Sequence, residues 1–289
     1  MADVEFTIER TGYLPIALNS DGGGSYGLQS GTTGFGVPTV IPQFTRGAGS
    51  GGQYRGERVD MRTMDIEILI LGDNRLTPGE LVRKLANLVR ARRNQPLPRL
   101  VATYATGEVY EVPFVYQSGL EIEYAESMSK STRVFLSVVC PDPFWTARDA
   151  LSFTIQNNSS SVGLLPEFAK LQVMASTAIG SVPVNNPGDV DADISWRITG
   201  PGGPTTIQVN GEGFVYNTTL IAGDIITVDG KTKTVANAAG VNQYAGLAAA
   251  PKFPTLQPGS NTVFVSMVGA TVGVSSVTGF YKPRREVIF

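Results

Sequence analysis

Most of the sequence consists of short runs in which apolar and polar residues alternate, and Gly or Pro ends nearly every run. Val4, Phe6 and Ile8 alternate with polar residues, and residues 63–70 repeat the pattern. A period of two is typical of a strand with one buried face. The 289 residues include 33 Gly and 18 Pro, which favour turns between short strands. The fold class predicted from this pattern is all-β dominated.

One stretch has the period of a helix instead. Thr77 is a candidate N-cap, Pro78 the first helical residue, and Glu80 completes a capping box. The apolar face that follows has helical spacing and consists of Leu81, Leu85, Leu88 and Val89. Cations occupy much of the remaining surface: Arg83, Lys84, Arg90, Arg92 and Arg93. We predict one helix, over residues 78–93, whose last arginines complement the negative end of the helix dipole.

The length of the chain favours two domains, because one hydrophobic core stops growing near roughly 250–300 residues. Pro141 and Pro143 cannot both lie in a central strand, so we place the boundary near residue 150. Residues 1–150 are the predicted first domain. Residues 151–289 are the predicted second domain, a β-sandwich of short strands with a two-residue hairpin turn at Asp229-Gly230. Strands are also expected over residues 120–124 and 271–277.

Residues 11–56 lose the alternation and are rich in Gly, Ser, Thr and Pro. A stretch of this length without periodicity is unusual inside a compact domain. Two interpretations remain open. The segment is either disordered or a long Gly-rich arm that becomes ordered against a partner.

Candidate interface residues flank this arm: Arg46, Tyr54, Arg55, Arg58 and Arg62. Arg and Tyr are enriched at protein interfaces, which favours contact with another subunit or with a tube. The alternative is an ordinary solvated strand face whose local partners are Glu57, Asp60 and Asp65. The sequence leaves both readings open.

The chain has no His and a single Cys, which removes whole classes of chemistry. Zinc sites built from Cys and His, nucleophile–His pairs and a disulfide within the chain are all excluded. We therefore expect no enzyme and no cofactor. Cys140 ends an apolar run and is predicted to be a small buried hydrophobic side chain.

Two clusters of acidic residues are predicted to lie on solvated surfaces and not to form a metal site or a catalytic site. Asp189, Asp191 and Asp193 have the spacing of the first calcium-loop ligands, but the required Gly and Glu are missing further on. A carboxylate pair for glycoside chemistry has three candidates, Glu121, Glu123 and Glu126, whose alternation with apolar residues predicts a solvated strand face. We expect no metal site and no catalytic residue.

The net charge of −2 recruits neither nucleic acid nor an anionic membrane. The N-terminus lacks the features of a signal peptide, and no apolar run is long enough to span a membrane. We expect synthesis in the host cytoplasm, no membrane insertion and no sequence-specific nucleic acid partner. Glycosylation sequons at Asn157, Asn158 and Asn217 are then chance matches.

The order of these features resembles the distal tail protein family of siphophages. Four local matches carry the resemblance: the charged strand Gly56–Ile68 before the capped helix, the closure Cys140–Trp145, the entry Asn186–Ile198, and the hairpin elements Ile221–Asp229 and Leu256–Asn261. Together they extend over nearly the whole chain. Each motif alone is common, but their order and spacing are specific.

The resemblance implies a small β-barrel or split-sandwich first domain that assembles into a homo-hexameric ring, and a galectin-like sandwich as the second domain. It implies a structural protein at the distal end of a phage tail, joining the tail tube to the tail-tip hub or baseplate. The implied partners are further copies of the chain, the tail tube protein, a tail-tip hub protein and also the tape measure protein.

Two rival functions remain to be tested. A carbohydrate-binding module contacting the host cell surface is the alternative, with Trp196, Tyr216 and Tyr244 as aromatics that stack on sugar. Fold analogy is a weak warrant for that function. A tail-associated hydrolase is the second rival, disfavoured by the missing His and nucleophile motifs.

Overall fold

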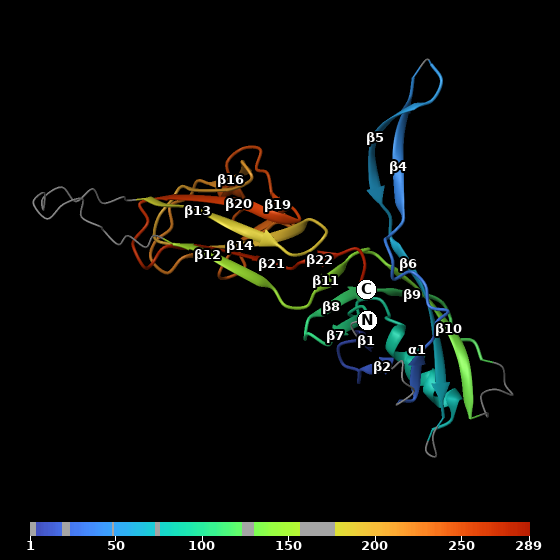
Figure 1. Cartoon of the computed structure of the whole chain (residues 1–289). Coiled ribbons are helices and arrows are strands. Elements are labelled where there is room, and N and C mark those ends of the chain that lie inside the picture. The colour runs from blue at the N-terminus through green and yellow to red at the C-terminus, as the bar shows by residue number, and fades with distance from the viewer. Residues whose placement is uncertain (1–3, 19–23, 48, 73–75, 123–129, 157–176) are drawn as a thin grey trace, which may run out of the picture. The chain divides into compact units, whose positions relative to one another are not determined.

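The computed structural model describes residues 4–18, 24–47, 49–72, 76–122, 130–156 and 177–289 (Figure 1). It divides into two compact units, Met1–Arg148 with Arg285–Phe289, and Asp149–Arg284. The chain leaves the first unit close to the predicted boundary near residue 150. The prediction that residues 151–289 form one domain differs at its end, because the last five residues return to the first unit.

The described residues of the first unit form two larger antiparallel sheets, a separate two-stranded hairpin and one α-helix. The larger sheet has the order β2 (Ile16–Leu18), β1 (Val4–Glu9), β7 (Arg99–Tyr104), β8 (Val109–Pro113), β11 (Trp145–Ala147) and β22 (Arg284–Arg285). The smaller has the order β3 (Tyr26–Leu28), β6 (Arg62–Leu71), β10 (Ser131–Cys140) and β9 (Val115–Gly119). Alternate residues of β6 are fully buried, as their period of two predicted.

Helix α1 (Pro78–Val89) begins with the predicted capping box, in which the Thr77 and Glu80 side chains each accept from the other's backbone N–H. The helix ends four residues before the predicted end at residue 93, because Arg90 leaves helical geometry with ψ 84°. Arg92 and Arg93 therefore lie beyond the helix, and their predicted role at its dipole is wrong.

Arg10 occupies that role instead. Its guanidinium is 5% exposed and donates to the carbonyl oxygens of Asn87, Leu88 and Arg90, at 3.2, 3.3 and 3.1 Å. A cation at the C-terminal end of a helix binds carbonyls that lack a partner within the helix and interacts favourably with the dipole. The sequence reading missed Arg10, since it lies far from the helix along the chain.

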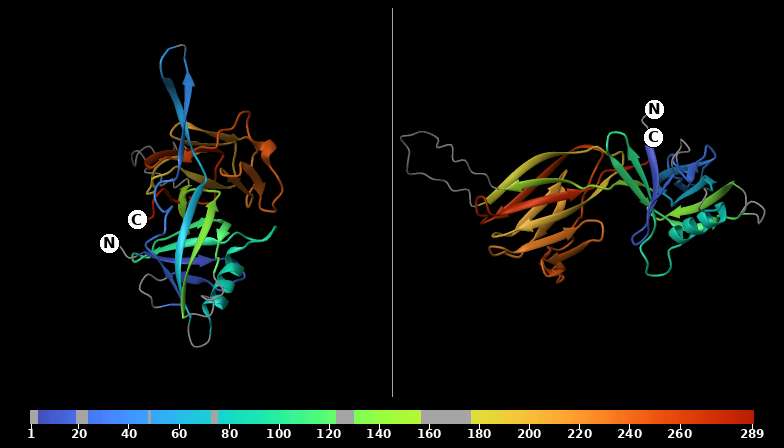
Figure 2. Two further views of the ribbon diagram at one scale, coloured as in Figure 1. Left: turned by 90° about the vertical axis from the view of Figure 1, so that its right-hand side faces the viewer. Right: turned by 90° about the horizontal axis from the view of Figure 1, so that it is seen from below.

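The Gly-rich stretch is not a structureless arm. It contains β2, β3, β4 (Val40–Arg46) and part of β5 (Gly52–Val59), and β4 and β5 pair as a two-stranded antiparallel hairpin. In Figures 1 and 2 this hairpin extends away from the two sheets of its own unit. Its strands escaped the sequence reading because most of their residues are exposed on both faces, so no apolar alternation marks them.

The second unit is a β-sandwich, in agreement with the predicted fold class. One sheet has the order β12 (Leu151–Gln156), β21 (Ser276–Tyr281), β14 (Ala192–Thr199), β17 (Ile225–Asp229) and β18 (Thr234–Asn237), with β19 (Thr255–Leu256) beside β14. The other has the order β13 (Thr177–Asn186), β20 (Gly259–Val268), β15 (Thr205–Val209) and β16 (Glu212–Tyr216). Buried residues of both sheets, such as Trp196 and Val265, form one core.

Three local predictions differ from the structure. The turn after Asp229 has four residues, because Asp229 pairs with Thr234 and Lys233 adopts a left-handed φ of 56°. The expected strand over residues 271–277 begins later, because residues 272–274 form a turn and only Ser276 and Val277 of that range lie in β21. Of the strand expected at residues 120–124, residues 120–122 are not in a strand, and residues 123 and 124 lie outside the described residues. β9 ends just before Leu120, which has a left-handed φ of 61°.

Arg62 joins chain segments that are distant in sequence. Its guanidinium donates to the carbonyl oxygens of Gly34, Gly36, Pro143 and Glu286, at 2.6 to 2.7 Å. The side chain is 2% exposed, and burial lowers the pKa of Arg62 below its ordinary value. Arg62 is therefore an internal cross-link and not an accessible interface residue, which corrects its prediction as one.

One of the two glycines that meet Arg62 is required by geometry. Gly34 has a φ of +91°, and a Cβ built there would lie 2.3 Å from the carbonyl oxygen of Thr63. Only Gly tolerates both the left-handed conformation and the close approach of the neighbouring backbone. Gly34 thus lets the segment before β4 lie against β6, where Arg62 holds it.

The last five residues complete the first unit. Ile288 is fully buried within its core. The ring of Phe289 lies edge-on to Phe6 and tilted to Phe35, with ring centroids 6.2 and 5.8 Å away. The Arg285 guanidinium lies 4.3 Å from the ring centroid of Tyr110, close enough for a cation–π contact. The first unit is therefore built from both ends of the described chain.

Replacing Arg62 with Met is expected to destabilise the first unit by on the order of 3 kcal/mol, because buried carbonyl oxygens lose their donors. The two tryptophans of the chain, Trp145 and Trp196, lie in different units. In a Trp196→Phe background, fluorescence during denaturant unfolding reports on the first unit through Trp145. Arg58→Met is the exposed control and should stay within about 0.5 kcal/mol of the parent. If the Arg62→Met and Arg58→Met variants have the same free energy of unfolding, the hydrogen bonds of Arg62 do not stabilise the first unit.

Ile288→Ala is expected to destabilise the same unit by roughly 3 kcal/mol, the usual cost of emptying a fully buried site. The same fluorescence measurement applies, with Leu14→Ala as the control because Leu14 is 89% exposed. Deleting residues 285–289 should be more damaging than either change. A deletion variant that unfolds like the parent would show that the segment is dispensable.

Candidate interaction surface

The β4–β5 hairpin presents four of the five predicted interface residues on one ribbon. Arg46, Tyr54, Arg55 and Arg58 are all exposed on it, whereas Arg62 is buried at its base. A bulge interrupts the pairing, since Gln43 faces Gly56 but Phe44 faces Tyr54, which leaves Arg55 without an opposite residue. Bulges increase the local twist of a ribbon and change the direction of its side chains.

Two aromatic side chains face each other across the hairpin. Phe44 is 61% exposed and Tyr54 is 55% exposed, and their ring centroids lie 5.9 Å apart in an edge-on arrangement. A cross-strand aromatic pair stabilises a hairpin but leaves much of its own apolar surface in water. The sequence reading identified Tyr54 but missed Phe44, because the strand that pairs them was not recognised.

The charged side chains of the hairpin make only exposed contacts. Arg55 donates to the Thr45 hydroxyl at 3.1 Å, and Arg58 lies 3.6 Å from an oxygen of Asp60. Exposed pairs of this kind contribute little to stability. The Asp60 contact belongs to the alternative reading of a solvated strand face, so the charges alone do not separate the two readings.

Two of the three predicted sugar-stacking aromatics are not accessible. Trp196 and Tyr216 are each 1% exposed, because they occupy inward positions of β14 and β16 in the sandwich core. That prediction is wrong for both. Tyr244 is 43% exposed, and its ring centroid lies 6.5 Å from that of Phe253.

The remaining residues singled out from the sequence fall in structural positions. Cys140 is fully buried, as predicted, and burial raises the pKa of its thiol to about 12, so it is no nucleophile at neutral pH. Asp191 accepts a hydrogen bond from the Thr255 hydroxyl at 3.0 Å. Glu121 is exposed, and Glu123, Glu126, Asn157 and Asn158 lie outside the described residues.

Neither a cluster of metal-binding side chains nor a membrane-spanning helix is present in the described ranges. No group of three or more Cys, Asp or Glu side chains in those ranges is placed to hold a metal ion. No helix among the residues that the structure describes has the length and apolar character needed to cross a membrane.

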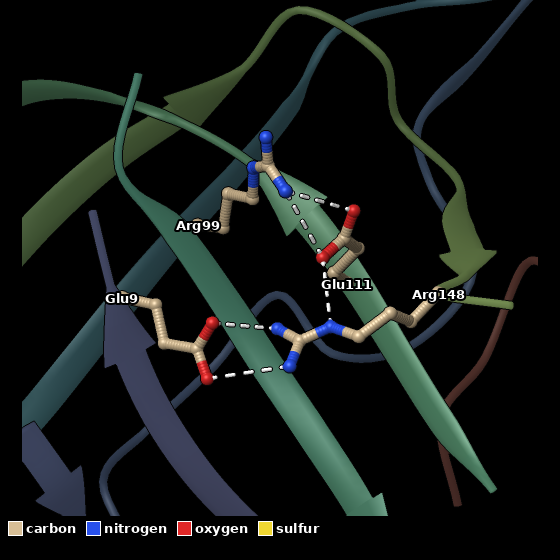
Figure 3. A network of polar contacts seen from close by, with 4 residues as sticks. All are labelled: Glu9, Arg99, Glu111 and Arg148. Carbon is tan, nitrogen blue, oxygen red and sulfur yellow. Dashed lines mark hydrogen bonds and ion pairs between the residues drawn. The ribbon is translucent and has the colours of Figure 1, made fainter. Parts of the chain in front are cut away.

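A network of four charged side chains covers one face of the larger sheet in the first unit (Figure 3). Arg148 contacts Glu9 at 2.6 Å and Glu111 at 3.2 Å, and Arg99 contacts Glu111 at 3.2 Å. Burial acts against the charge of Arg148, but the two carboxylates raise its pKa above the ordinary value. Each carboxylate is held by a guanidinium, which fits a structural role at the point where the chain leaves this unit.

One family model matches part of the chain. Residues 187–284 match the family model described as siphovirus-type tail component, C-terminal domain. No curated protein sequence matches the chain.

One solved phage structure shares the fold of the chain, and a second is less similar. The distal tail protein Dit (gp 19.1) of phage SPP1, described as a paradigm of the hub adsorption apparatus in phages infecting Gram-positive bacteria, has a TM-score of 0.61 at 16% identity. The match covers 96% of this chain and 98% of that one. A chain of the phage P2 baseplate in its activated conformation has a TM-score of 0.49 at 9% identity, covering 99% of this chain and 100% of that one.

The family-model match over residues 187–284 and the fold shared with SPP1 Dit support the resemblance of the chain to the distal tail protein family.

Proposed function

We propose that this chain is a structural protein of the distal tail of a long-tailed phage, where copies of it form a ring, six-membered by the family resemblance. The ring joins the tail tube to the tail-tip hub or baseplate. The tail component domain over residues 187–284 supports the location. The observation that carries the ring itself is the exposed β4–β5 hairpin of the first unit.

A two-stranded hairpin with both faces in water is marginally stable by itself. β4 and β5 pair over residues 40–59, and most of their side chains are exposed. The ribbon also leaves Phe44 and Tyr54 in solvent, although a large aromatic side chain gains free energy on burial. A second surface that covers this ribbon would stabilise the hairpin and would also bury the two aromatic side chains.

A second copy of the chain is the proposed partner. The Arg62 cross-link holds the base of the hairpin at Gly34 and Gly36, so the hairpin leaves every copy in the same direction. A projection of fixed direction that meets a different surface on the next copy makes a heterologous contact, and such contacts close into a ring when the rotation between copies is constant. The tube, hub and tape measure proteins are proposed as the ring's further partners.

No catalytic residue and no cofactor are part of this proposal, and the role is structural. The carbohydrate-binding alternative relied on three aromatic side chains. Two of them, Trp196 and Tyr216, are buried in the sandwich core and cannot stack on a sugar.

Charge reversal at Arg55 or Arg58, and the pair Phe44→Ser with Tyr54→Ser, are expected to shift the purified protein from ring toward monomer by at least about tenfold in dissociation constant. The charge-reversal variants should keep the unfolding curve of the parent, because these side chains are exposed. The Phe44→Ser, Tyr54→Ser pair should lower only the stability of the hairpin, whose cross-strand aromatic contact it removes. Sedimentation velocity over a range of concentrations measures the shift. Arg197→Glu is the matched control, as Arg197 is an exposed arginine of the second unit.

Negative-stain class averages of the wild-type protein provide the direct view, and six-fold rings with a central opening are expected. Rings that form equally well in all hairpin variants would contradict the assigned contact but leave the ring itself standing. A wild-type protein that stays monomeric at high concentration would contradict self-assembly.

A further inference from the structure

Residues Arg285–Phe289, called the strap from here on, belong to the first unit, although the chain reaches them only after the whole second unit. Ile288 is fully buried in the core of the first unit. At the other end of the strap, the Arg285 guanidinium lies 4.3 Å from the ring centroid of Tyr110 and 3.2 Å from a carboxylate oxygen of Glu108. The strap is therefore bound to the first unit at two separate points.

The bound strap also contacts the segment from which the β4–β5 hairpin starts. The Arg62 guanidinium donates to the Glu286 carbonyl oxygen at 2.6 Å and to the carbonyl oxygens of the two glycines on either side of Phe35. Phe35 itself is 5% exposed, and its ring centroid lies 5.8 Å from that of Phe289. One polar and one aromatic contact thus connect the strap to the base of the hairpin.

The fold of the second unit keeps the strap close to its binding site. A flexible chain as long as Asp149–Arg284 would lose much entropy if its two ends were brought together. In the folded second unit, β12 pairs with β21 so that Leu151 lies opposite Tyr281. The entry and the exit of this unit are therefore neighbours, and the strap follows the exit after only a few residues. Folding of the second unit thus raises the effective concentration of the strap at the first unit.

We propose that the strap couples folding of the second unit to the position of the hairpin. A folded second unit delivers the strap, the bound strap completes the contacts at Arg62 and Phe35, and these contacts fix the base of the hairpin. A chain whose second unit is unfolded binds its strap less often and does not present a hairpin of fixed direction to the next copy. The inference rests on the proposed function, because the hairpin is the contact between copies, and it adds a control on that contact.

Backbone hydrogen bonds at the base of the hairpin provide the readout. Thr33 and Asp65 each donate to the other's carbonyl oxygen, at 2.8 and 3.3 Å, and Asp60 donates to the carbonyl oxygen of Thr39 at 2.8 Å. Exchange of these amide hydrogens with solvent measures how often the base opens. The amides of α1 report on the core of the same unit, so a local change at the base can be separated from loss of the fold.

The test is a Gly-Ser linker of about 20 residues inserted between Arg284 and Arg285, which removes no side chain. Its ends are separated by roughly 25 Å on average, so it lowers the effective concentration of the strap. The amides at the base of the hairpin should exchange about tenfold faster than in wild type, and the amides of α1 should exchange at the wild-type rate. Hydrogen-exchange mass spectrometry on the full chain, at a dilution where it is monomeric, makes the comparison.

The same linker inserted between Ala249 and Ala250 is the matched control. Both residues are exposed in a loop of the second unit, so this insertion lengthens the chain equally but leaves the strap next to the exit. The control should exchange like wild type at the base of the hairpin. Unchanged exchange there in the Arg284–Arg285 insertion would overturn the proposal. Equal acceleration in the control, or in α1, would overturn it as well, because the effect would not belong to the strap.

The exchange experiment does not depend on ring formation, since it uses the monomer. A protein that never forms rings would contradict the proposed function and leave the exchange result as it is. Rings that form while the base amides are indifferent to the linker would contradict the coupling alone.

Discussion

The Arg62 guanidinium binds carbonyl oxygens from the segment before the hairpin, from Pro143 and from Glu286, so three parts of the chain meet at one buried cation. None of these segments belongs to regular pairing at that point, and a planar group with several donors satisfies their carbonyls together. The base of the hairpin, the start of β11 and the returning C-terminal segment therefore depend on the same side chain. Arg10 likewise donates to backbone carbonyl oxygens that would otherwise lack a donor, three of them at the end of α1.

This arrangement divides the first unit into a rigid part and a projecting part. Below Arg62, the sheets, the helix and Ile288 share one closed core. Beyond it, β4 and β5 leave that core with Phe44 and Tyr54 in water. Such a hairpin is only marginally stable in a single chain, because both of its faces are exposed to water. In an assembly, its base sets its direction and the surface that covers it stabilises it. The second unit, inserted between Arg148 and Arg285, can then carry a separate role without disturbing that core.

Local structure could be predicted from the sequence wherever burial of one face imposes a regular spacing of apolar residues. The alternation of β6, the capping box at Thr77 and the burial of Cys140 were all predicted, because each reflects a local rule. The hairpin could not be read, since both of its faces are exposed and no pattern marks them. Arg62 was assigned to the surface because charge is a poor guide to burial when the partners are backbone carbonyls.

The central claim is that the hairpin, fixed at its base, is covered by another copy of the chain. A photo-crosslinking amino acid placed at Phe44 tests it most directly. The variant is mixed with an equal amount of heavy-isotope-labelled chain, irradiated, digested and analysed by mass spectrometry. Cross-linked peptides that join labelled and unlabelled chains are the predicted result. Cross-links confined to peptides of a single chain, at a concentration where the protein is assembled, would contradict the claim.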